Sequence, residues 1–255
     1  MNHSDMMFSQ IQRKHFNTIA DQYVERLNEA AYLYYFGETK RIILNTLISY
    51  FGKEDLLCKR GLDVGCGVGD ITGSLARSSG SMTGTDIAEG MCRLASHKQV
   101  EFMSRFLPAS SNSLPFKDSS FDFIISAHVF HHLIDPEVLK STIREFRRIV
   151  KSGGLMVIVD VNPVNPISKL TQYLMVKRGV DTGKEKLIFP WIIFKEFRAS
   201  SIKHFYYRGY CFVPHLLPCL SSLNDFFGKT PLHVFGKDYI IAGIPDKEAA
   251  DESTP

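Results

Sequence analysis

The sequence predicts an α/β fold built on a mostly parallel, doubly wound sheet. Between Gly61 and Asp160, short apolar segments alternate with segments of helical periodicity, and this alternation is typical of βαβ units. One of these segments, FDFIISA, is bounded by turn residues, as expected of a strand that is covered on both faces. Ligands of such sheets bind beyond the carboxyl ends of the strands.

The individual elements follow from local patterns along the chain. Residues 8–58 are expected to be helical, because their apolar side chains recur at helical spacing. Proline and glycine residues within 161–190 indicate an irregular insertion. The helix at 135–151 begins with Asp135 as its cap and stops at two glycines. The expected strands are 61–65, 81–86, 99–103, 121–127 and 154–160, with strand-like runs at 202–207 and 239–244, and the remaining helices lie near 70–79 and 88–96.

Composition is that of a globular protein, with 44% hydrophobic residues and a formal net charge of +3. A charge this small does not favour a nucleic-acid partner, and no apolar run reaches the roughly 18–20 residues of a membrane span. The five cysteines form no CxxC pair and no zinc-type spacing, and the first residues lack the apolar region of a secretory signal. We therefore expect a cytoplasmic protein with no metal site and no nucleic-acid partner.

The segment GLDVGCGVGD, from Gly61 to Asp70, predicts a small-molecule site. An apolar strand carrying Asp63 breaks into a loop with a glycine at every second position, and a helix follows. Glycine lets a ligand approach the backbone, and the free N–H groups of the following helix face the loop. The loop is therefore expected to cradle a ligand.

Two acids narrow the choice of ligand. Asp70 stands where a dinucleotide fingerprint requires its third glycine, which disfavours NAD and FAD, and no GxxxxGK segment indicates a P-loop. Asp86 ends the next predicted strand, where a carboxylate can accept both hydroxyls of a ribose. Together with Asp63, these features predict a ligand with a ribose but no phosphates.

Several segments in the same order resemble the class I S-adenosylmethionine-dependent methyltransferases. They are LDVGCGVG, TGTDIAEGM, LPFKDSSFDFIISAHVFHHLID and IVKSGGLMVIVD, with HFNTIADQY near the start. The segments that begin LPFKDSS, IVKSGG and HFNTIA are similar to the small-molecule (type 11) branch, which includes quinone-biosynthesis enzymes. The resemblance covers about 60–160. It implies a Rossmann-like seven-stranded sheet with helices on both faces and an antiparallel C-terminal strand, and S-adenosyl-L-methionine as the donor, with S-adenosyl-L-homocysteine as the product.

The resemblance also implies cofactor contacts residue by residue. Asp63 would lie near the ammonium group and Asp86 on the ribose, while Tyr23 would either close over the cofactor or only pack in the core. The family usually places an acid on the adenine amino group, but this chain has only serines and an asparagine there, whose hydroxyl or amide can still accept that bond. The implied set is Tyr23, Asp63, Gly65, Cys66, Gly67, Asp86, Ile87, Met91, Ser111, Asn112 and Ser126.

Four regions are expected from these patterns. Residues 1–58 would form a helical cap over the cofactor and residues 59–160 the cofactor-binding core. Residues 161–246 would form a lid with the last strands, and residues 247–255 a flexible tail. Within 161–210, nine lysines and arginines are interleaved with aromatic residues. This stretch is either a solvated face over an aromatic core or a surface for a lipid-like substrate or a membrane.

The candidate catalytic residues are His128 and His131, which follow the fourth strand. A neutral imidazole can remove a proton from a phenol or an acidic carbon, although HHL can also serve only as the strand-to-helix turn. The fourth strand ends in SAHV rather than an [ND]PPY-like sequence, which favours oxygen or carbon over nitrogen as the methylated atom. The predicted function is methyl transfer to a small phenolic, quinone-like or lipid-like acceptor. A non-catalytic cofactor-binding partner or sensor, and a nicotinamide oxidoreductase, remain as alternatives.

Overall fold

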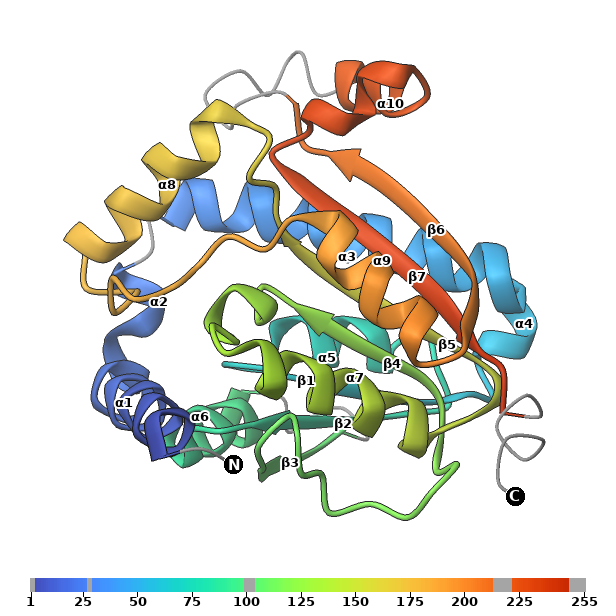
Figure 1. Cartoon of the computed structure of the whole chain (residues 1–255), viewed down its shortest axis with the longest axis horizontal. Helices are drawn as coiled ribbons and strands as arrows, with labels where there is room; N and C mark the ends of the chain where they lie inside the picture. The colour runs from blue at the N-terminus through green and yellow to red at the C-terminus, as the bar shows by residue number, and fades with distance from the viewer. Residues whose placement is uncertain (1–2, 27–28, 99–103, 213–221, 248–255) are drawn as a thin grey trace.

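A seven-stranded sheet forms the centre of the computed structural model, which describes residues 3–26, 29–98, 104–212 and 222–247. The strands are β1 (Arg60–Val64), β2 (Ser81–Asp86), β3 (Ser104–Pro108), β4 (Phe121–Ala127), β5 (Val150–Val161), β6 (Ile202–Tyr210) and β7 (Asp238–Pro245). Their order is β3-β2-β1-β4-β5-β7-β6 (Figure 1). Neighbours from β3 to β5 pair in parallel, whereas β7 pairs antiparallel with β5 and β6. The predicted fold class is therefore confirmed.

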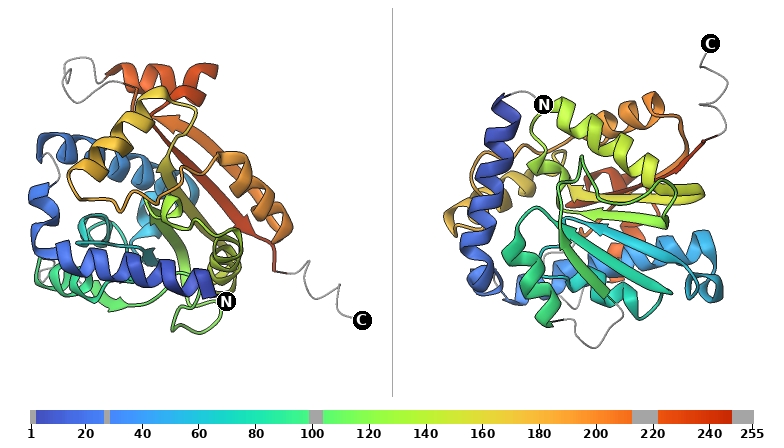
Figure 2. Two further views of the ribbon diagram at one scale, coloured as in Figure 1. Left: turned by 60° about the vertical axis from the view of Figure 1, so that its left-hand side comes forward. Right: turned by 90° about the horizontal axis from the view of Figure 1, so that it is seen from below.

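Helices lie on both faces of the sheet. The α-helices are α1 (His3–Ile19), α2 (Tyr23–Arg26), α3 (Glu29–Phe51), α4 (Lys53–Leu56), α5 (Asp70–Ala76), α6 (Glu89–Lys98), α7 (Pro136–Ile149), α8 (Pro166–Lys177), α9 (Pro190–Ala199) and α10 (Ser222–Gly228). Short 3₁₀ turns are η1 (Ala20–Gln22), η2 (Phe130–His132) and η4 (Pro231–Phe235). Figure 1 shows α7 and α9 in front of the sheet and α3 and α5 behind it, and Figure 2 shows α1 lying along α6.

The core has two layers because the central strands bury apolar side chains on both faces. In β4, Ile124 packs toward α7 and α9, whereas Phe123 and Ile125 pack toward α3 and α5. All three side chains are fully buried. This agrees with the interpretation of FDFIISA as a strand covered on both sides, and it leaves the carboxyl ends of the strands as the accessible edge.

The predicted strand at 99–103, like residues 248–255 of the predicted tail, lies outside the described residues. The third strand of the sheet is β3, at Ser104–Pro108, which pairs with Met82–Asp86 of β2. Both segments combine apolar and polar residues over a short length. Local periodicity could not distinguish them, because pairing with β2 is a tertiary contact.

Two boundaries in the second half of the chain differ from the prediction. Gly153 and Gly154 were expected to end a helix, yet α7 ends at Ile149 and β5 already begins at Val150. Gly153 has a φ of +68° and lies where the register of β4 and β5 shifts, so the glycines mark an irregularity within a strand. Pro166, interpreted as part of an irregular insertion, is instead the first residue of α8, and the Asn165 side chain caps this helix by accepting a hydrogen bond from Ile167 N at 2.8 Å.

The N-terminal helix is joined to the segment that follows α8. Gln12 Nε2 donates to Glu185 Oε1 at 3.1 Å, and His15 Nε2 lies 2.9 Å from Val180 O. These contacts close the molecule over the carboxyl edge of the sheet (Figure 2). Within the described ranges, none of the helices has the length and apolar character needed to cross a membrane.

Candidate functional site

A cavity of about 340 Å³ lies at the carboxyl ends of β1, β2 and β4. Side chains from α1 and α3 and from the turn before α7 complete its wall. Asn112, Ser126 and His131 do not line this cavity, although the sequence suggested them as site residues. The sequence-predicted residues that do line it are Tyr23, Asp63, Gly65, Cys66, Gly67, Asp86, Ile87, Met91, Ser111 and His128.

The glycine loop between β1 and α5 forms one side of the cavity. Gly65 N donates to Thr85 O at 2.7 Å, which joins the loop to β2. Gly65 has a φ of +78°, and a Cβ at this position would lie 2.1 Å from Val129 Cγ2, so a larger residue does not fit. Beside Gly67, an added Cβ would meet no described atom within 4 Å. The loop therefore leaves room for a ligand against its backbone.

Two carboxylates, the buried Asp63 and the partly buried Asp86, provide the acidic part of the cavity. Asp63 Oδ2 accepts a hydrogen bond from Thr72 Oγ1 at 2.6 Å, yet burial raises the pKa of Asp63 to about 7. Asp86 accepts backbone N–H groups from Gly67 and Ala88, both at 2.9 Å, and burial raises its pKa as well.

No lysine, arginine or histidine of the described part of the chain forms an ion pair with either carboxylate. Buried acids without a cationic partner are costly to ionise. A ligand with a positive charge and hydroxyl donors would supply what this part of the cavity lacks.

Aromatic and aliphatic side chains form the other part of the cavity wall. Phe16, Phe36, Val129 and Leu133 line it, and Tyr32 donates its hydroxyl hydrogen to Asp70. Burial raises the pKa of Tyr32, so it stays a neutral phenol. This wall suits an apolar or aromatic molecule bound next to the acidic part.

Cys66 lines the cavity without the character of a nucleophile. Its contact with Cys92, together with burial, raises the pKa of the thiol well above its usual value. A thiol that stays protonated is a poor nucleophile, so Cys66 contributes to the cavity wall by packing.

The structure explains why Ser126 and Asn112 lie away from the cavity. Ser126 is fully buried, and its Oγ donates to Val64 O at 2.9 Å, so its hydroxyl joins β4 to β1. Asn112 Oδ1 accepts a hydrogen bond from Ser110 Oγ at 2.7 Å within the loop after β3. Of the polar residues proposed for the adenine end, Ser111 lines the cavity, and its Oγ lies 3.0 Å from Thr142 Oγ1.

His128, a predicted catalytic residue, lines the cavity directly after β4. Its backbone has a φ of +58°, which is uncommon for a non-glycine residue. Its Nε2 lies 3.5 Å from Thr39 Oγ1, and burial lowers its pKa. His128 is therefore a neutral imidazole at neutral pH.

His131, the other predicted catalytic residue, is held by a buried ion pair instead of facing the cavity. Its Nδ1 lies 2.6 Å from Asp160 Oδ1, and its backbone N–H donates to Asp160 Oδ2 at 2.8 Å. Burial alone would lower the pKa of His131, but the charge of Asp160 outweighs it and raises the pKa to about 9. A proton held this firmly makes His131 an anchor between η2 and β5.

His132 occupies the position in the cavity that was expected for His131. Its Nδ1 is buried and lies 3.6 Å from Glu185 Oε1. Glu185 accepts hydrogen bonds from Gln12 and from the backbone N–H groups of Thr182 and Gly183. Burial would raise the pKa of Glu185, but these bonds and His132 hold it well below its usual range. Burial lowers the pKa of His132, so a neutral imidazole faces an ionised carboxylate.

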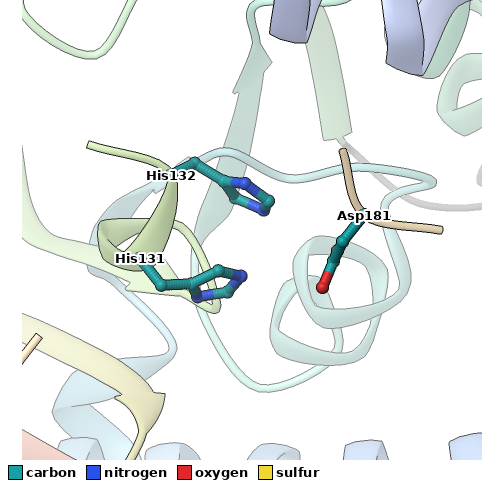
Figure 3. Close-up of side chains that lie close together, drawn as sticks. All are labelled: His131, His132 and Asp181. Carbon is teal, nitrogen blue, oxygen red and sulfur yellow. The ribbon is translucent and has the colours of Figure 1, made fainter. Parts of the chain in front are cut away.

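His131, His132 and Asp181 form a cluster whose donor atoms lie within 4.8 Å of one another (Figure 3). The proton on His131, held by Asp160, gives this cluster a positive charge close to the carboxylates of Asp181 and Glu185. Its charges are thus balanced among its own side chains, and the sequence-based expectation of no metal site stays a prediction.

Comparison with known proteins shows what this architecture is similar to. A family model described as a methyltransferase domain matches residues 62–158, which carry the glycine loop, Asp86 and the histidines. This match covers less than half of the chain. It confirms the resemblance recognised in the sequence.

Relatives of the methyltransferase domain include a demethylmenaquinone methyltransferase of Staphylococcus aureus (strain MRSA252). It is 30% identical over an alignment of 143 residues that covers 52% of this chain and 58% of that protein. The chain thus spans little more than half the length of this curated relative.

Solved structures share the fold at low identity. Magnesium protoporphyrin IX methyltransferase from Synechocystis PCC 6803, with bound SAM, is 16% identical with a TM-score of 0.66, covering 94% of this chain and 97% of that one. A possible histamine N-methyltransferase from Thermotoga maritima is 17% identical with a TM-score of 0.57, covering 85% and 98%. At these identities the likeness shows the fold alone.

Several residues near the cavity were not singled out from the sequence. Tyr32 and Phe36 stand four residues apart on α3, which is a usable signal for one helix face. Gln12 and Glu185 carry no such signal, because they are 173 residues apart and meet only in the folded chain. The sequence does not distinguish His132 from His131. The two differ in the folded chain because the Asp160 carboxylate pairs with His131.

The His131–Asp160 ion pair predicts a defined dependence of stability on pH. Because folding raises the pKa of His131 from about 6.5 to about 9, the stabilisation is complete below pH 6.5 and is lost as the pH rises through 9. Asp160→Asn should lower the free energy of unfolding by about 3–5 kcal/mol near neutral pH. The difference from the wild type should shrink above about pH 9, as measured by urea unfolding.

The matched control is Asp118→Asn, which removes an exposed partner of Arg148. It should change the unfolding free energy by no more than about 1 kcal/mol at every pH. Parallel stability curves for the wild type and Asp160→Asn from about pH 6 to pH 10 would show that the pair does not hold the proton.

Proposed function

We propose that this protein is an S-adenosylmethionine-dependent methyltransferase that acts on oxygen or carbon of a small phenolic, quinone-like or lipid-like acceptor. The observation that carries this proposal is a single cavity with two uncompensated acids at one end and apolar side chains with neutral histidines at the other. The methyltransferase domain at residues 62–158 supports it. S-Adenosylmethionine supplies an electrophilic methyl group on a positively charged sulfonium.

The acidic end fits this cofactor by charge and by hydrogen bonding. Asp63 would receive the ammonium group, which favours the ionised form of this carboxylate. Asp86 already accepts two backbone N–H groups, and ionised carboxylate oxygens have further lone pairs for the ribose hydroxyls. The open space at Gly67 would let the ligand lie against the backbone.

The apolar end would hold the acceptor and exclude water. Phe16 and Phe36 contribute aromatic surface there, and Phe16 meets the ring of His132 edge to face, with ring centres 5.4 Å apart. Alignment of the two reactants in such a pocket can lower the activation free energy by about 7–11 kcal/mol. A reduced naphthoquinone is the first acceptor to test, because the 30% identical relative is named for demethylmenaquinone.

His132 is the residue best placed to take the acceptor's proton. Because Glu185 lies beside Nδ1, the proton of the neutral ring is favoured on Nδ1 and the lone pair on Nε2. As Nε2 takes the proton, the acceptor's electron pair would form the new bond to the methyl carbon while the bond from sulfur to that carbon breaks. Glu185 then stabilises the imidazolium. His128 lines the same cavity and is a second candidate, but no described carboxylate lies at ion-pair distance from it.

Substituting Asp86 tests the cofactor assignment. Asp86→Ala should weaken binding of S-adenosylhomocysteine by roughly ten- to a hundredfold, because hydrogen bonds to a charged group are lost. Calorimetric titration measures the affinity. In parallel, isotope-labelled S-adenosylmethionine should label a reduced naphthoquinone or a simple phenol with the wild type.

The control is Asp55→Ala, an exposed acid on α4, which should bind the ligand as the wild type does. Unchanged affinity in Asp86→Ala would contradict the ribose assignment. Binding of cofactor with no labelled product from any acceptor, including a metabolite extract, would favour a non-catalytic cofactor-binding protein.

Substituting His132 tests the base. With the acceptor found by labelling, His132→Ala should lower kcat by roughly 10²–10⁴-fold and leave affinity for S-adenosylhomocysteine nearly unchanged. Glu185→Gln should lower the pKa of His132, since the carboxylate raises it, and so shift the acid limb of the kcat/KM profile to lower pH. An unshifted acid limb in Glu185→Gln would assign the titrating group elsewhere.

A further inference from the structure

Helix α8 turns two of its polar side chains, Ser168 and Gln172, toward the protein. Ser168 is fully buried, and its Oγ donates to Lys237 O at 3.3 Å. Gln172 is partly buried, and its Nε2 donates to Glu185 O at 3.0 Å. A surface helix normally buries its apolar face and exposes the polar one, whereas these two polar side chains of α8 face inward.

The outward face of α8 is correspondingly apolar. Ile167, Leu170, Tyr173 and Leu174 are exposed to 49%, 57%, 62% and 38%. Their spacing of three, six and seven residues puts them on one side of the helix. Solvent exposure of four large apolar side chains in three turns is unfavourable unless something covers them.

The apolar surface continues beyond α8. Asn165 Nδ2, at the start of α8, donates to Phe235 O in η4 at 2.6 Å, and α10 packs on η4. Figure 1 and the left view of Figure 2 show α8 and α10 at the same end of the molecule. Nine of the fifteen large hydrophobic side chains that are exposed in the described residues belong to this end of the molecule, so exposed apolar side chains are concentrated there. This α8 surface consists of Val164, Ile167, Leu170, Tyr173, Leu174, Leu223, Phe226, Leu232 and Phe235.

The charges on α8 have a single sign. The sequence from Asn162 to Val180 contains no acidic residue, and Lys169, Lys177 and Arg178 are all exposed there. Lys229, directly after α10, is also exposed. Apolar side chains with lysine and arginine beside them are the pattern of a helix that lies in the headgroup region of an anionic bilayer.

We propose that the α8 surface docks on a membrane that contains anionic phospholipid. The apolar side chains would enter the interface, and the basic residues would meet the lipid phosphates. The sequence had suggested the whole stretch 161–210 for such contact. The structure narrows this stretch to α8 and adds α10 and η4, which lie beyond it in the chain.

This docking would serve a lipid-like acceptor, and in that respect it rests on the proposed function. The segment after α8 leads directly to Glu185, which contacts both Gln12 and His132 at the cavity wall. The membrane-facing helix is thus one short segment away from the acceptor end of the cavity. An acceptor dissolved in the bilayer would reach the cavity from that side.

Vesicle co-sedimentation of the full chain, without cofactor or acceptor, tests the docking independently of catalysis. The protein should pellet with vesicles of equimolar phosphatidylcholine and phosphatidylglycerol, and much less with phosphatidylcholine alone. Added salt should weaken binding. Leu170→Glu should reduce partitioning at least about tenfold. The control Leu57→Glu changes a leucine of similar exposure at the end of α4, outside the α8 surface, and should bind as the wild type does.

Three outcomes would overturn the proposal. They are the absence of vesicle binding by the wild type, equal binding to vesicles with and without phosphatidylglycerol, and an equal loss in Leu57→Glu and Leu170→Glu. A dimer seen by light scattering that dissociates in Leu170→Glu, without vesicle binding, would assign the surface to a second copy of the chain. Because no step of this assay involves methyl transfer, its failure would leave the proposed activity standing.

Discussion

Asp63 and Asp86 line one cavity, and among the described residues no lysine, arginine or histidine forms an ion pair with either of them. Under the proposed function, this imbalance of charge would select the ligand. Burial disfavours the ionised form of both carboxylates. A dinucleotide phosphate would add negative charge to a cavity that Asp70 also lines. A sulfonium nucleoside with an ammonium group would instead relieve the imbalance, while its ribose hydroxyls would donate to Asp86. Charge alone would then favour this cofactor over a dinucleotide, without any contribution from the shape of the cavity.

The fold maintains this arrangement with buried polar contacts on both sides of the cavity. On one side, the Thr85 carbonyl accepts a hydrogen bond from Gly65 N and joins the glycine loop to β2, and Asp86 accepts a hydrogen bond from Gly67 N. On the other side, Asp160 of β5 holds His131, which fixes the neighbouring His132 at the wall. The segment carrying Glu185 and the helix carrying Gln12 close over the top. The acidic and apolar ends of the cavity are thus supported by different parts of the chain.

The acidic end of the site was predictable from the sequence, whereas the apolar end was largely not. Asp63, Gly65, Gly67 and Asp86 fall in short local motifs at strand ends, and parallel pairing necessarily brings those ends together. Glu185 and Gln12 meet only through tertiary contacts. His131 and His132 take different positions because Asp160 pairs with His131, which is also a tertiary contact. The inverted orientation of α8 was equally hidden, because its apolar spacing is the same whether that face is buried or exposed.

Proton exchange on cofactor binding tests the central claim most directly. At about pH 6.5, the ammonium group is fully charged and most of the Asp63 population is protonated. Binding of S-adenosylmethionine should therefore release a substantial fraction of a proton, measured by calorimetry in buffers of different ionisation enthalpy, and Asp63→Asn should abolish this release. No release by the wild type, or the same release by Asp63→Asn, would contradict the account.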